Sequence, residues 1–420
     1  MDKAATDGIK RGPAFTRYQA FVIAVLAFLQ FSVILDFMII SPLGAMMMPT
    51  LHMSPQQFGL AVSSYAFSAG VSSLLAAGFA DRFDRKRLLL FFYGGFVLGT
   101  LFCALANTFP LLLGARIVTG LFGGVIGAII LAIATDLFPL AVRGRVMGYI
   151  QTAFAASQVL GLPAGLYFAN HWDWHAPFLA IVAISVPAGL VIAFWMKPVA
   201  AHLELRQEKS PFLHLLHTLT EPRYRTAFAL NVLLPTGGYM LMPFATAYMV
   251  GNVGLPLSDL PTIYLVTGVS IVFAGPLIGR FSDAVGKFRT FCWGTGLTIL
   301  MVAIWTNLGH VSLLTMTAVN VLLFLGIFGR VIPSQALISA IPEVSKRGAF
   351  NAVSASLQQF AGGVSSAIAG VVIAVAPDGT LLHFNWLGGI VMTVALISMI
   401  LMYQVHQQVP EQFSGPAPRR

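Results

Sequence analysis

One carboxylate interrupts a long apolar segment of this chain. Asp36 lies within SVILDFMIIS, residues 32–41, where the neighbours on both sides are apolar or small. A charge at the centre of a membrane helix costs roughly 2.5–3.5 kcal/mol on insertion scales, so such groups usually mark an ion or substrate pathway. A carboxyl group that moves between water and an apolar site can take up and release a proton. Asp36 is therefore our candidate for a proton-coupling residue.

Two arginines also lie inside apolar segments, Arg116 in ARIVTGLFGGVIG and Arg330 in FGRVIPSQAL. An apolar cavity favours the neutral carboxyl group, whereas a nearby arginine favours the carboxylate, so motion that changes either one alters proton affinity. We expect Arg116 to act in proton coupling with Asp36. Arg330 is either the partner of Asp36 or a substrate-cavity residue. Two alternatives stay open: a fixed Asp36–Arg pair that only holds helices together, and an Arg116 that snorkels to the membrane surface.

Further polar side chains in the apolar segments are candidates for hydrogen bonds to a small-molecule substrate. Phe and Met side chains would shape the apolar part of the same pocket. Each of these polar residues could equally be a satisfied packing residue. The candidates are Gln30, Asn231, Tyr239, Ser334, Gln335, Gln358 and Gln359.

The elements that position these residues must be membrane helices. The chain has 420 residues, of which 57% are hydrophobic and 9% charged, with a mean hydropathy of +0.83. At about 20 apolar residues for each crossing, this length accommodates about a dozen spans. The apolar segments predict an all-α membrane protein of twelve transmembrane helices in two pseudo-symmetric six-helix bundles. We place the bundles at 18–196 and 226–404, a linker at 197–225, and tails at 1–17 and 405–420.

The distribution of positive charge predicts the orientation of the helices. Cytoplasmic loops retain an excess of Lys and Arg. With the N-terminus inside, every one of the 24 Lys and Arg residues except Arg116 and Arg330 falls in a cytoplasmic segment. This predicts an inner-membrane protein with both termini and the linker in the cytoplasm. It also removes the nucleic-acid interpretation of a pI near 9.8, because the charges flank spans rather than form a binding surface.

The two halves repeat each other. AGFADRFDRKR (77–87) and GRFSDAVGKFR (279–289) each follow the second predicted helix of a half, and Asp81 and Asp283 are 202 positions apart. Arg143 and Arg347, each followed by Gly, are 204 positions apart. A duplicated six-helix unit in a membrane protein is chiefly a transporter architecture, with the substrate site between the halves.

The segment 77–87 resembles the signature G-x-L-A-D-R-x-G-R-K-R of the major facilitator superfamily, with Ala77 and Asp84 in place of its two glycines. The resemblance implies cytoplasmic loops that gate transport by linking the two halves in the outward-open state. The gating residues that it implies are Asp81, Arg82, Arg85, Lys86, Arg87, Asp283, Gly286, Lys287, Arg143 and Arg347.

Two further motifs are similar to those of proton-coupled exporters in this family. Arg116 and Gly120 match an R-x-x-Q-G motif in which Thr119 stands for Gln. Gly161, Pro163 and Gly165 resemble a G-x-P-x-G motif in the fifth helix of the drug- and sugar-efflux branch. The first implies proton transfer at Arg116, and the second implies a kinked packing helix whose role is conformational.

We therefore expect a secondary transporter, monomeric and in contact with lipid, that exports drugs or small amphipathic metabolites by alternating access in exchange for protons. The nearest alternative is proton-coupled export or uptake of sugars or related metabolites. A membrane sensor or a membrane-embedded enzyme is more remote, because two deep arginines and one acid do not form a catalytic set. We expect no metal site and no cofactor other than the proton, and no phosphate-binding loop for ATP is present in the sequence.

Overall fold

The computed structural model describes residues 15–200, 203, 217–343 and 347–409, apart from the side chains of 77–79, 81, 140–141 and 347. Its first half consists of helices with short turns between them. In chain order these are α1 (Arg17–Thr50), α2 (Pro55–Phe79), the 3₁₀ turn η1 (Ala80–Arg82), α3 (Arg85–Ala104), α4 (Phe109–Leu137), α5 (Leu140–Ala156), the π-helical turn η2 (Ser157–Gly161), α6 (Leu162–His171) and α7 (Ala176–Trp195).

The second half is again helical, with one short hairpin. Its elements are η4 (Pro222–Tyr224), α9 (Arg225–Gly251), η5 (Leu257–Asp259), α10 (Leu260–Val285), α11 (Lys287–Trp305), α12 (Leu313–Ile338), α13 (Arg347–Val372), β1 (Ala374–Val375), β2 (Leu381–Leu382) and α14 (Phe384–Gln408). The two strands are antiparallel, with Ala374 opposite Leu382 and Val375 opposite Leu381.

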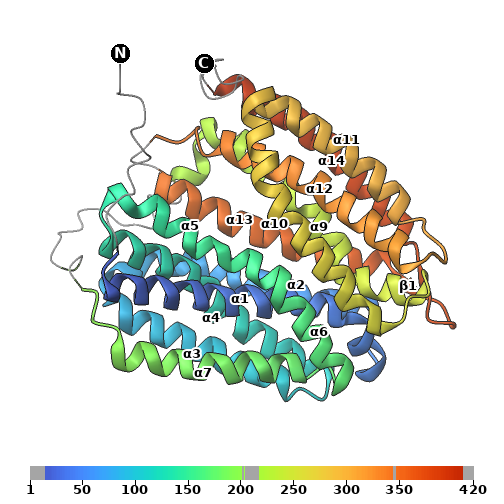
Figure 1. Cartoon of the computed structure of the whole chain (residues 1–420), viewed down its shortest axis with the longest axis horizontal. Coiled ribbons are helices and arrows are strands. Elements are labelled where there is room, and N and C mark those ends of the chain that lie inside the picture. The colour runs from blue at the N-terminus through green and yellow to red at the C-terminus, as the bar shows by residue number, and fades with distance from the viewer. Residues whose placement is uncertain (1–14, 201–202, 204–216, 344–346, 410–420) are drawn as a thin grey trace, which may run out of the picture.

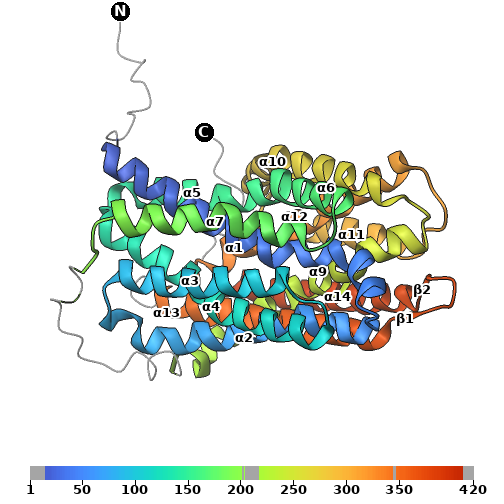
Figure 2. The ribbon, with the colours of Figure 1, turned by 90° about the horizontal axis from the view of Figure 1, so that it is seen from below.

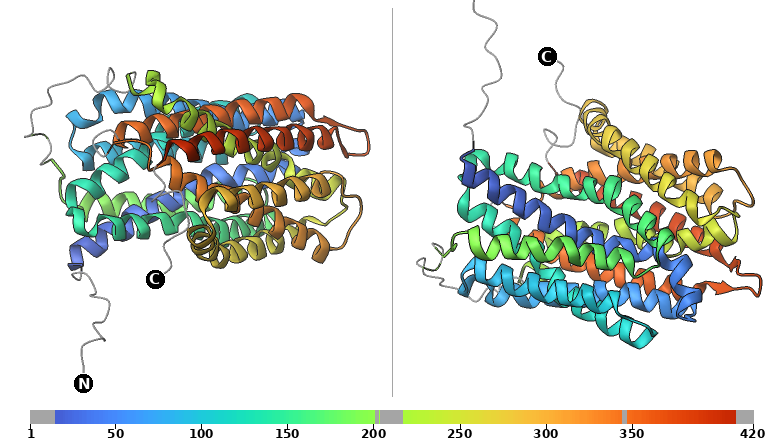
Figure 3. Two further views of the ribbon diagram at one scale, coloured as in Figure 1. Left: turned by 90° about the horizontal axis from the view of Figure 1, so that it is seen from above. Right: turned by 60° about the horizontal axis from the view of Figure 1, so that its bottom comes forward.

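The helices lie lengthwise beside one another, with α3, α4 and α7 along one edge of the molecule and α11, α12 and α14 along the opposite edge (Figure 1). Further views confirm that the helices of both halves follow the same long axis (Figure 3). The hairpin of β1 and β2 projects from one end of this assembly (Figure 2). We call this the hairpin end, and the end where α1 begins and α14 finishes the terminal end.

Local sequence signals set several helix boundaries. Thr16 and Ser54 each accept a hydrogen bond from the backbone of Gln19 and Gln57, respectively, whose side chains bond back to form capping boxes. Such reciprocal bonds satisfy donors that the first turn of a helix leaves free. They fix where α1 and α2 begin.

Ten helices in the described part of the chain are long and apolar enough to cross a membrane. The other two spans expected from the sequence, 146–169 and 348–376, correspond to α5–η2–α6 and to α13. The π-helical turn divides the first of these, and serine, glutamine and glycine residues lower the apolar content of α13. In the described part of the chain, ten of the twelve expected spans are therefore single helices that are long and apolar enough to cross a membrane. The twelve-span count and the orientation stay predictions.

The hydrophobic core is shared at one end of the molecule and divided at the other. At the hairpin end, one cluster combines side chains of both halves, among them Met47, Phe58, Leu166, Phe244 and Tyr248. At the terminal end, one cluster draws only on residues 22–199 and another only on residues 224–409. The halves are thus sealed together at the hairpin end and packed separately at the terminal end.

Direct contacts between the halves agree with this division. On α2, a Cβ atom added to Gly59 would lie 2.7 Å from the carbonyl oxygen of Ser366 and 3.0 Å from Cα of Gly370, both on α13. The amide nitrogen Nδ2 of Asn170, at the end of α6, donates to the Leu257 carbonyl at 2.9 Å. The backbones of the two halves therefore touch where the shared core lies.

Candidate functional site

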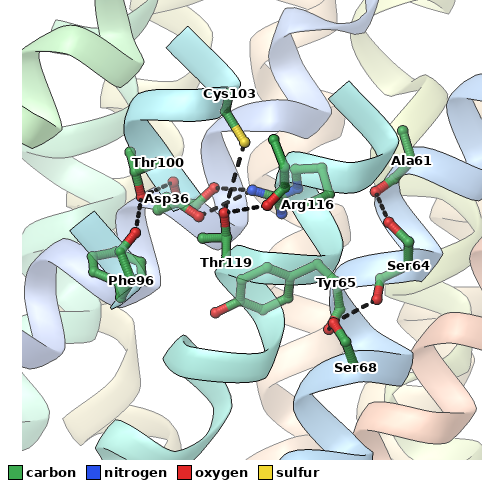
Figure 4. A network of polar contacts seen from close by, with 11 residues as sticks. Asp36, Ala61, Ser64, Tyr65, Ser68, Phe96, Thr100, Cys103, Arg116 and Thr119 are labelled. Atoms are coloured by element: carbon green, nitrogen blue, oxygen red, sulfur yellow. Dashed lines mark hydrogen bonds and ion pairs between the residues drawn. The ribbon is translucent and has the colours of Figure 1, made fainter. Parts of the chain in front are cut away.

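Asp36 is fully enclosed, with no exposed surface, between three helices of the first half. Its Oδ1 accepts a hydrogen bond from the Thr100 hydroxyl on α3 at 3.0 Å, and its Oδ2 accepts one from Nη1 of Arg116 on α4 at 3.0 Å. Figure 4 shows the carboxylate held between these two side chains. The sequence left the partner of Asp36 open between two arginines, and the structure pairs it with Arg116.

Arg116 is enclosed as completely as its partner, with no exposed surface. It does not snorkel to a membrane surface, so the structure removes that alternative. Its Nη1 also lies 3.4 Å from the backbone carbonyl of Asp36, and its guanidinium carbon lies 4.6 Å from the centre of the Tyr65 ring on α2. A cation over an aromatic face is attracted by the negative face of the ring. Tyr65 is thus a further member of the site.

The ion pair uses only part of the donor capacity of the arginine. Nε and Nη2 of Arg116 are buried without a hydrogen-bond partner in the described part of the chain. A saturated arginine–carboxylate pair uses two parallel N–H···O bonds. Opposite charges hold the two side chains together. A single N–H···O bond between them leaves their relative orientation incompletely fixed.

Glycines on α4 allow the helices to approach closely enough to enclose the pair. A Cβ atom on Gly120 would lie 3.0 Å from Cα of Tyr65, and one on Gly124 would lie 2.6 Å from Cα of Ala69. On the other side, a Cβ atom on Gly99 of α3 would lie 2.8 Å from the backbone nitrogen of Thr119. These are backbone-to-backbone contacts of the kind that small-x-x-x-small patterns permit in membranes.

Thr119 forms a hydrogen bond within its own helix. It stands at the position where the R-x-x-Q-G motif has Gln. Its hydroxyl donates to the Ala115 carbonyl at 2.7 Å and lies 3.8 Å from the Cys103 sulfur. Sequence reasoning did not single out Thr100, Tyr65 or Cys103. Each is an ordinary residue of an apolar helix, and only the packing register of α2, α3 and α4 brings them to Asp36.

An aromatic contact joins this site to the second half. The Phe37 ring, next to Asp36, lies 5.2 Å from the Tyr65 ring and 5.9 Å from the Tyr239 ring on α9. The Tyr239 hydroxyl donates to Oε1 of Gln359 on α13 at 3.2 Å. The ion pair is enclosed by helices of the first half, and Phe37 connects it to α9 of the second half.

Polar side chains form a seam between α9 and α13. Asn231 donates to the Ser354 hydroxyl at 3.1 Å and accepts from Nε2 of Gln358 at 3.3 Å. The Ser366 hydroxyl donates to the Tyr239 carbonyl at 3.0 Å. The seam includes four of the seven candidate cavity residues, Asn231, Tyr239, Gln358 and Gln359, together with Ser354 and Ser366, which sequence reasoning missed.

The other three candidate cavity residues lie apart from the seam. Gln30 is half-buried on α1, with its Oε1 near Gly127 of α4. Ser334 is fully buried and donates to the Val331 carbonyl within its own helix at 2.9 Å. Gln335 is exposed. Ser334 thus has the contacts of a satisfied packing residue.

Arg330, on α12, is buried to 5% exposure and does not pair with Asp36. Its guanidinium carbon lies 5.7 Å from the centre of the Phe291 ring on α11. Its Nε and Nη2 are enclosed without a partner among the described residues.

The predicted gating residues make contacts within their own halves in this structure. Nε of Arg85 lies 3.2 Å from Oδ2 of Asp136, Lys86 donates to the Ala193 carbonyl at 2.9 Å, and Lys287 lies 3.3 Å from Asp283. Nε and Nη2 of Arg143 donate to the carbonyls of Phe138 and Thr135 at 2.8 and 2.6 Å. Each of these contacts joins two residues of the same half.

The remaining gating residues are placed as follows. Arg82 and Arg87 are exposed, and Gly286 has φ of 107°, a backbone conformation that glycine adopts readily between α10 and α11. The side chains of Asp81 and Arg347 lie outside the described residues.

Asp84 replaces a glycine of the resembling signature, and its contacts explain the replacement. Its backbone has φ of −55°, where no glycine is needed. Its Oδ1 accepts from the backbone nitrogen of Arg87 at 2.9 Å and caps α3, while its Oδ2 accepts from the backbone nitrogen of Val199 at 2.8 Å. One carboxylate thus starts a helix and fixes the chain that leaves α7.

The segment around Gly161, Pro163 and Gly165 contains the π-helical turn η2, and Pro163 lies in the first turn of α6. A Cβ atom on Gly161 would lie 2.7 Å from Cδ1 of Leu35, and one on Gly165 would lie 2.5 Å from Cδ1 of Ile39. The two glycines therefore let α5–η2–α6 lie directly on α1, on either side of Asp36 in sequence.

Comparison with known proteins places these features in a family context. A family model described as the Major Facilitator Superfamily matches residues 26–370. The uncharacterized MFS-type transporter YceJ of Bacillus subtilis is 24% identical over 91% of this chain and 95% of its own length. Multidrug resistance protein 2 of the same organism is 24% identical over 63% of this chain and 68% of its own length.

Solved structures share the fold at low sequence identity. A bacterial homolog of the human lysosomal transporter Spinster, in an inward-facing and occupied conformation, superposes with a TM-score of 0.73 at 13% identity and covers 96% of this chain and 100% of its own. The nucleoside transporter NupG superposes with a TM-score of 0.73 at 13% identity and covers 92% of this chain and 99% of its own. At these identities the likeness concerns the fold alone.

Proposed function

This chain belongs to the Major Facilitator Superfamily, and we propose that it is a proton-coupled secondary transporter that exports drugs or small amphipathic metabolites. Membership of the family makes it a multi-pass membrane transport protein. The coupling ion, the direction and the substrate are our proposals. The observation that carries the proposed coupling ion is the enclosed Asp36–Arg116 pair, which Phe37 connects to the second half.

Asp36 would carry the proton. Its carboxylate has no contact with water in this state and depends on one hydrogen bond from Thr100 and one from Arg116 for its charge. Protonation would remove the attraction to Arg116, and withdrawal of Arg116 would favour protonation, so pair geometry and proton occupancy are linked. Because the pair uses only one guanidinium nitrogen, a small helix movement suffices to open it.

Alternating access would provide that movement. The shared core seals the hairpin end, and the separate cores leave the terminal end free to part. With the predicted cytoplasmic termini, this is an inward-facing arrangement of two six-helix bundles. Rocking to the opposite state would break the contacts between α2 and α13 and between α6 and η5 and would bring the loops around Asp81 and Asp283 together. The proposed gate then acts in the state that is not seen here.

One observation supports drugs as the substrate class, and another supports sugars. Multidrug resistance protein 2 is among the relatives, and its name supports drug efflux. The polar seam between α9 and α13 offers amide and hydroxyl groups that also suit a sugar, which keeps sugar transport as the second candidate.

Proteoliposomes with an imposed pH gradient test the proposal. The panel contains benzoate, chloramphenicol, ethidium and arabinose, so that it spans anionic, neutral, cationic and sugar-like compounds. Asp36→Asn should abolish acceleration of transport by the gradient, whereas Asp173→Asn, which changes an exposed loop carboxylate, should not. If the Asp36→Asn protein responds to the gradient as the parent does, the proposed proton site is wrong.

A further inference from the structure

Arg330 is an intramembrane cation for which the described residues provide no acceptor. Its residue surface is 5% exposed, and its Nε and Nη2 are enclosed without a hydrogen bond. Neither an Asp nor a Glu of the described chain forms an ion pair with it. Burial of a charge without a partner is strongly unfavourable, so a buried unpaired arginine indicates a ligand as its partner.

The charges of the neighbouring site do not compensate Arg330. Among the described residues, Asp36 is the only Asp or Glu in the interior of a predicted span, and it is already paired with Arg116. One positive charge is therefore left over. This surplus favours an anion over a cation in the region near Arg330.

The surroundings of Arg330 hold the side chain in place without neutralising it. A Cβ atom on Gly294 of α11 would lie 2.9 Å from the backbone nitrogen of Arg330, so the two helices touch at this position. The Phe291 ring, one turn before Gly294, faces the guanidinium at 5.7 Å. Close packing and an aromatic neighbour restrict the side chain while its enclosed donors keep their capacity for an acceptor.

We propose that Arg330 binds the carboxylate group of a small amphipathic substrate, with the apolar part of that substrate against neighbouring aromatic and aliphatic side chains. The planar guanidinium presents parallel donors whose spacing matches the two oxygens of a carboxylate. This inference rests on the proposed transport function and narrows its substrate class to organic anions. Cationic drugs are disfavoured by the same charge.

Binding of benzoate to the purified full-length protein tests the inference, with thermal unfolding as the readout because a ligand of the folded state raises its stability. Benzamide is the neutral compound of nearly the same shape, and phosphate and chloride at equal ionic strength are the inorganic anions. The variants are Arg330→Gln and Arg330→Met. The matched control is Arg223→Gln, which removes an arginine whose side chain is 58% exposed.

We expect benzoate to stabilise the parent and Arg223→Gln, and benzamide, phosphate and chloride to have little effect. Both Arg330 variants should bind benzoate at least tenfold more weakly, a loss of about 1.4 kcal/mol. Without ligand, Arg330→Met should unfold at the same temperature as the parent or higher, because an uncompensated buried charge has been removed. An arginine with only a structural role would give a lower temperature.

Three binding results would overturn the inference. They are benzoate binding that the Arg330 variants retain, the absence of any benzoate effect on the parent, and an equal effect of phosphate or chloride, which would make Arg330 a site for an adventitious ion only. A lower unfolding temperature of ligand-free Arg330→Met would overturn it as well. The proton proposal is judged separately by Asp36→Asn. If that variant stays coupled while benzoate binding still needs Arg330, the coupling proposal fails and the anion site stands.

Discussion

The glycines of α4 let it lie close to α2 and so fix the position of the helix that carries Arg116, and a single added methyl group tests this. In Gly124→Ala the new Cβ would lie 2.6 Å from both Cα and the carbonyl oxygen of Ala69 on α2, whereas ordinary contact begins at 3.4 Å. The helices must separate by about 0.8 Å, because backbone atoms cannot rotate away as side-chain atoms do. Arg116 lies two helical turns from this contact and moves with α4.

The expected cost follows from this overlap. Overpacking of a filled interior by one methyl group typically costs about 1–3 kcal/mol. At about 2–4 °C for each kcal/mol in a unit of 150–250 residues, the unfolding temperature of Gly124→Ala should fall by roughly 2–12 °C. Gradient-driven transport should fall as well, because a displacement of α4 by this amount shifts Arg116 relative to Asp36 on α1, and the two are joined by a single carboxylate hydrogen bond of 3.0 Å.

Two glycines of the same helix provide matched controls. Around Gly114 nothing lies within 4 Å of an added Cβ, and near Gly127 the closest atom is Oε1 of Gln30 at 3.8 Å. Gly114→Ala and Gly127→Ala should leave transport unchanged and raise stability slightly, by about 0.5–1 kcal/mol, since alanine favours the helix. If Gly124→Ala unfolds at the same temperature as these controls and transports equally well, the helix approach does not set the geometry of the ion pair.

Three further predictions concern single contacts. Asp84→Ala removes the cap of α3, and its unfolding free energy should fall by about 0.5–2 kcal/mol in chemical denaturation, with Asp84→Asn retaining part of the cap. Tyr239→Phe keeps the ring beside Phe37 but loses the hydrogen bond to Gln359, so we expect stability to fall by about 0.5–1.5 kcal/mol and gradient-driven transport to persist; Tyr239→Ala should slow transport more. Asn170→Ala removes a hydrogen bond between the halves at the hairpin end, and thiol labelling of a cysteine introduced at Met48 should become faster, whereas an unchanged labelling rate would show that the shared core alone keeps this end closed.

The sequence predicted the membrane helices and the intramembrane charges because both depend on local composition. A run of about 20 apolar residues has one favourable environment, and a charge within it is conspicuous wherever the helix ends up. The approximate helix positions followed for the same reason. The π-helical turn in the fifth predicted span lay beyond this reasoning, because a Gly/Pro pattern indicates a kink without its geometry.

The partners of each charge could not be predicted, because they depend on the register between helices distant in sequence. Asp36 could have paired with either arginine by composition alone, and Thr100 and Tyr65 carry no signal that distinguishes them from other hydroxyl residues in apolar helices. The glycine spacing of α4 permits close approach of another helix but does not identify α2 and α3 as its neighbours. Ser354 was missed beside Asn231 and Gln358 for the same reason.

The conformational state was equally beyond the sequence. The resemblance implied gating contacts between the halves, whereas Arg85, Lys86, Arg143 and Lys287 all bond within their own half here. Two states of a transporter differ by only a few kcal/mol. The same residues can therefore link the halves in one state and make contacts within their own half in the other, and only a structure distinguishes the two.

Exchange of a proton for an organic anion places a requirement on the site that can be measured. Protonation of Asp36 leaves Arg116 unpaired and the region more positive, so direct electrostatics strengthens anion binding, as co-transport requires. Exchange requires protonation to weaken anion binding. Protonation can do this only by shifting the balance between the inward and outward states. We therefore expect benzoate to bind the parent more weakly at low pH and Asp36→Asn to bind it with little dependence on pH. Stronger binding by the parent at low pH would instead indicate co-transport and refute exchange.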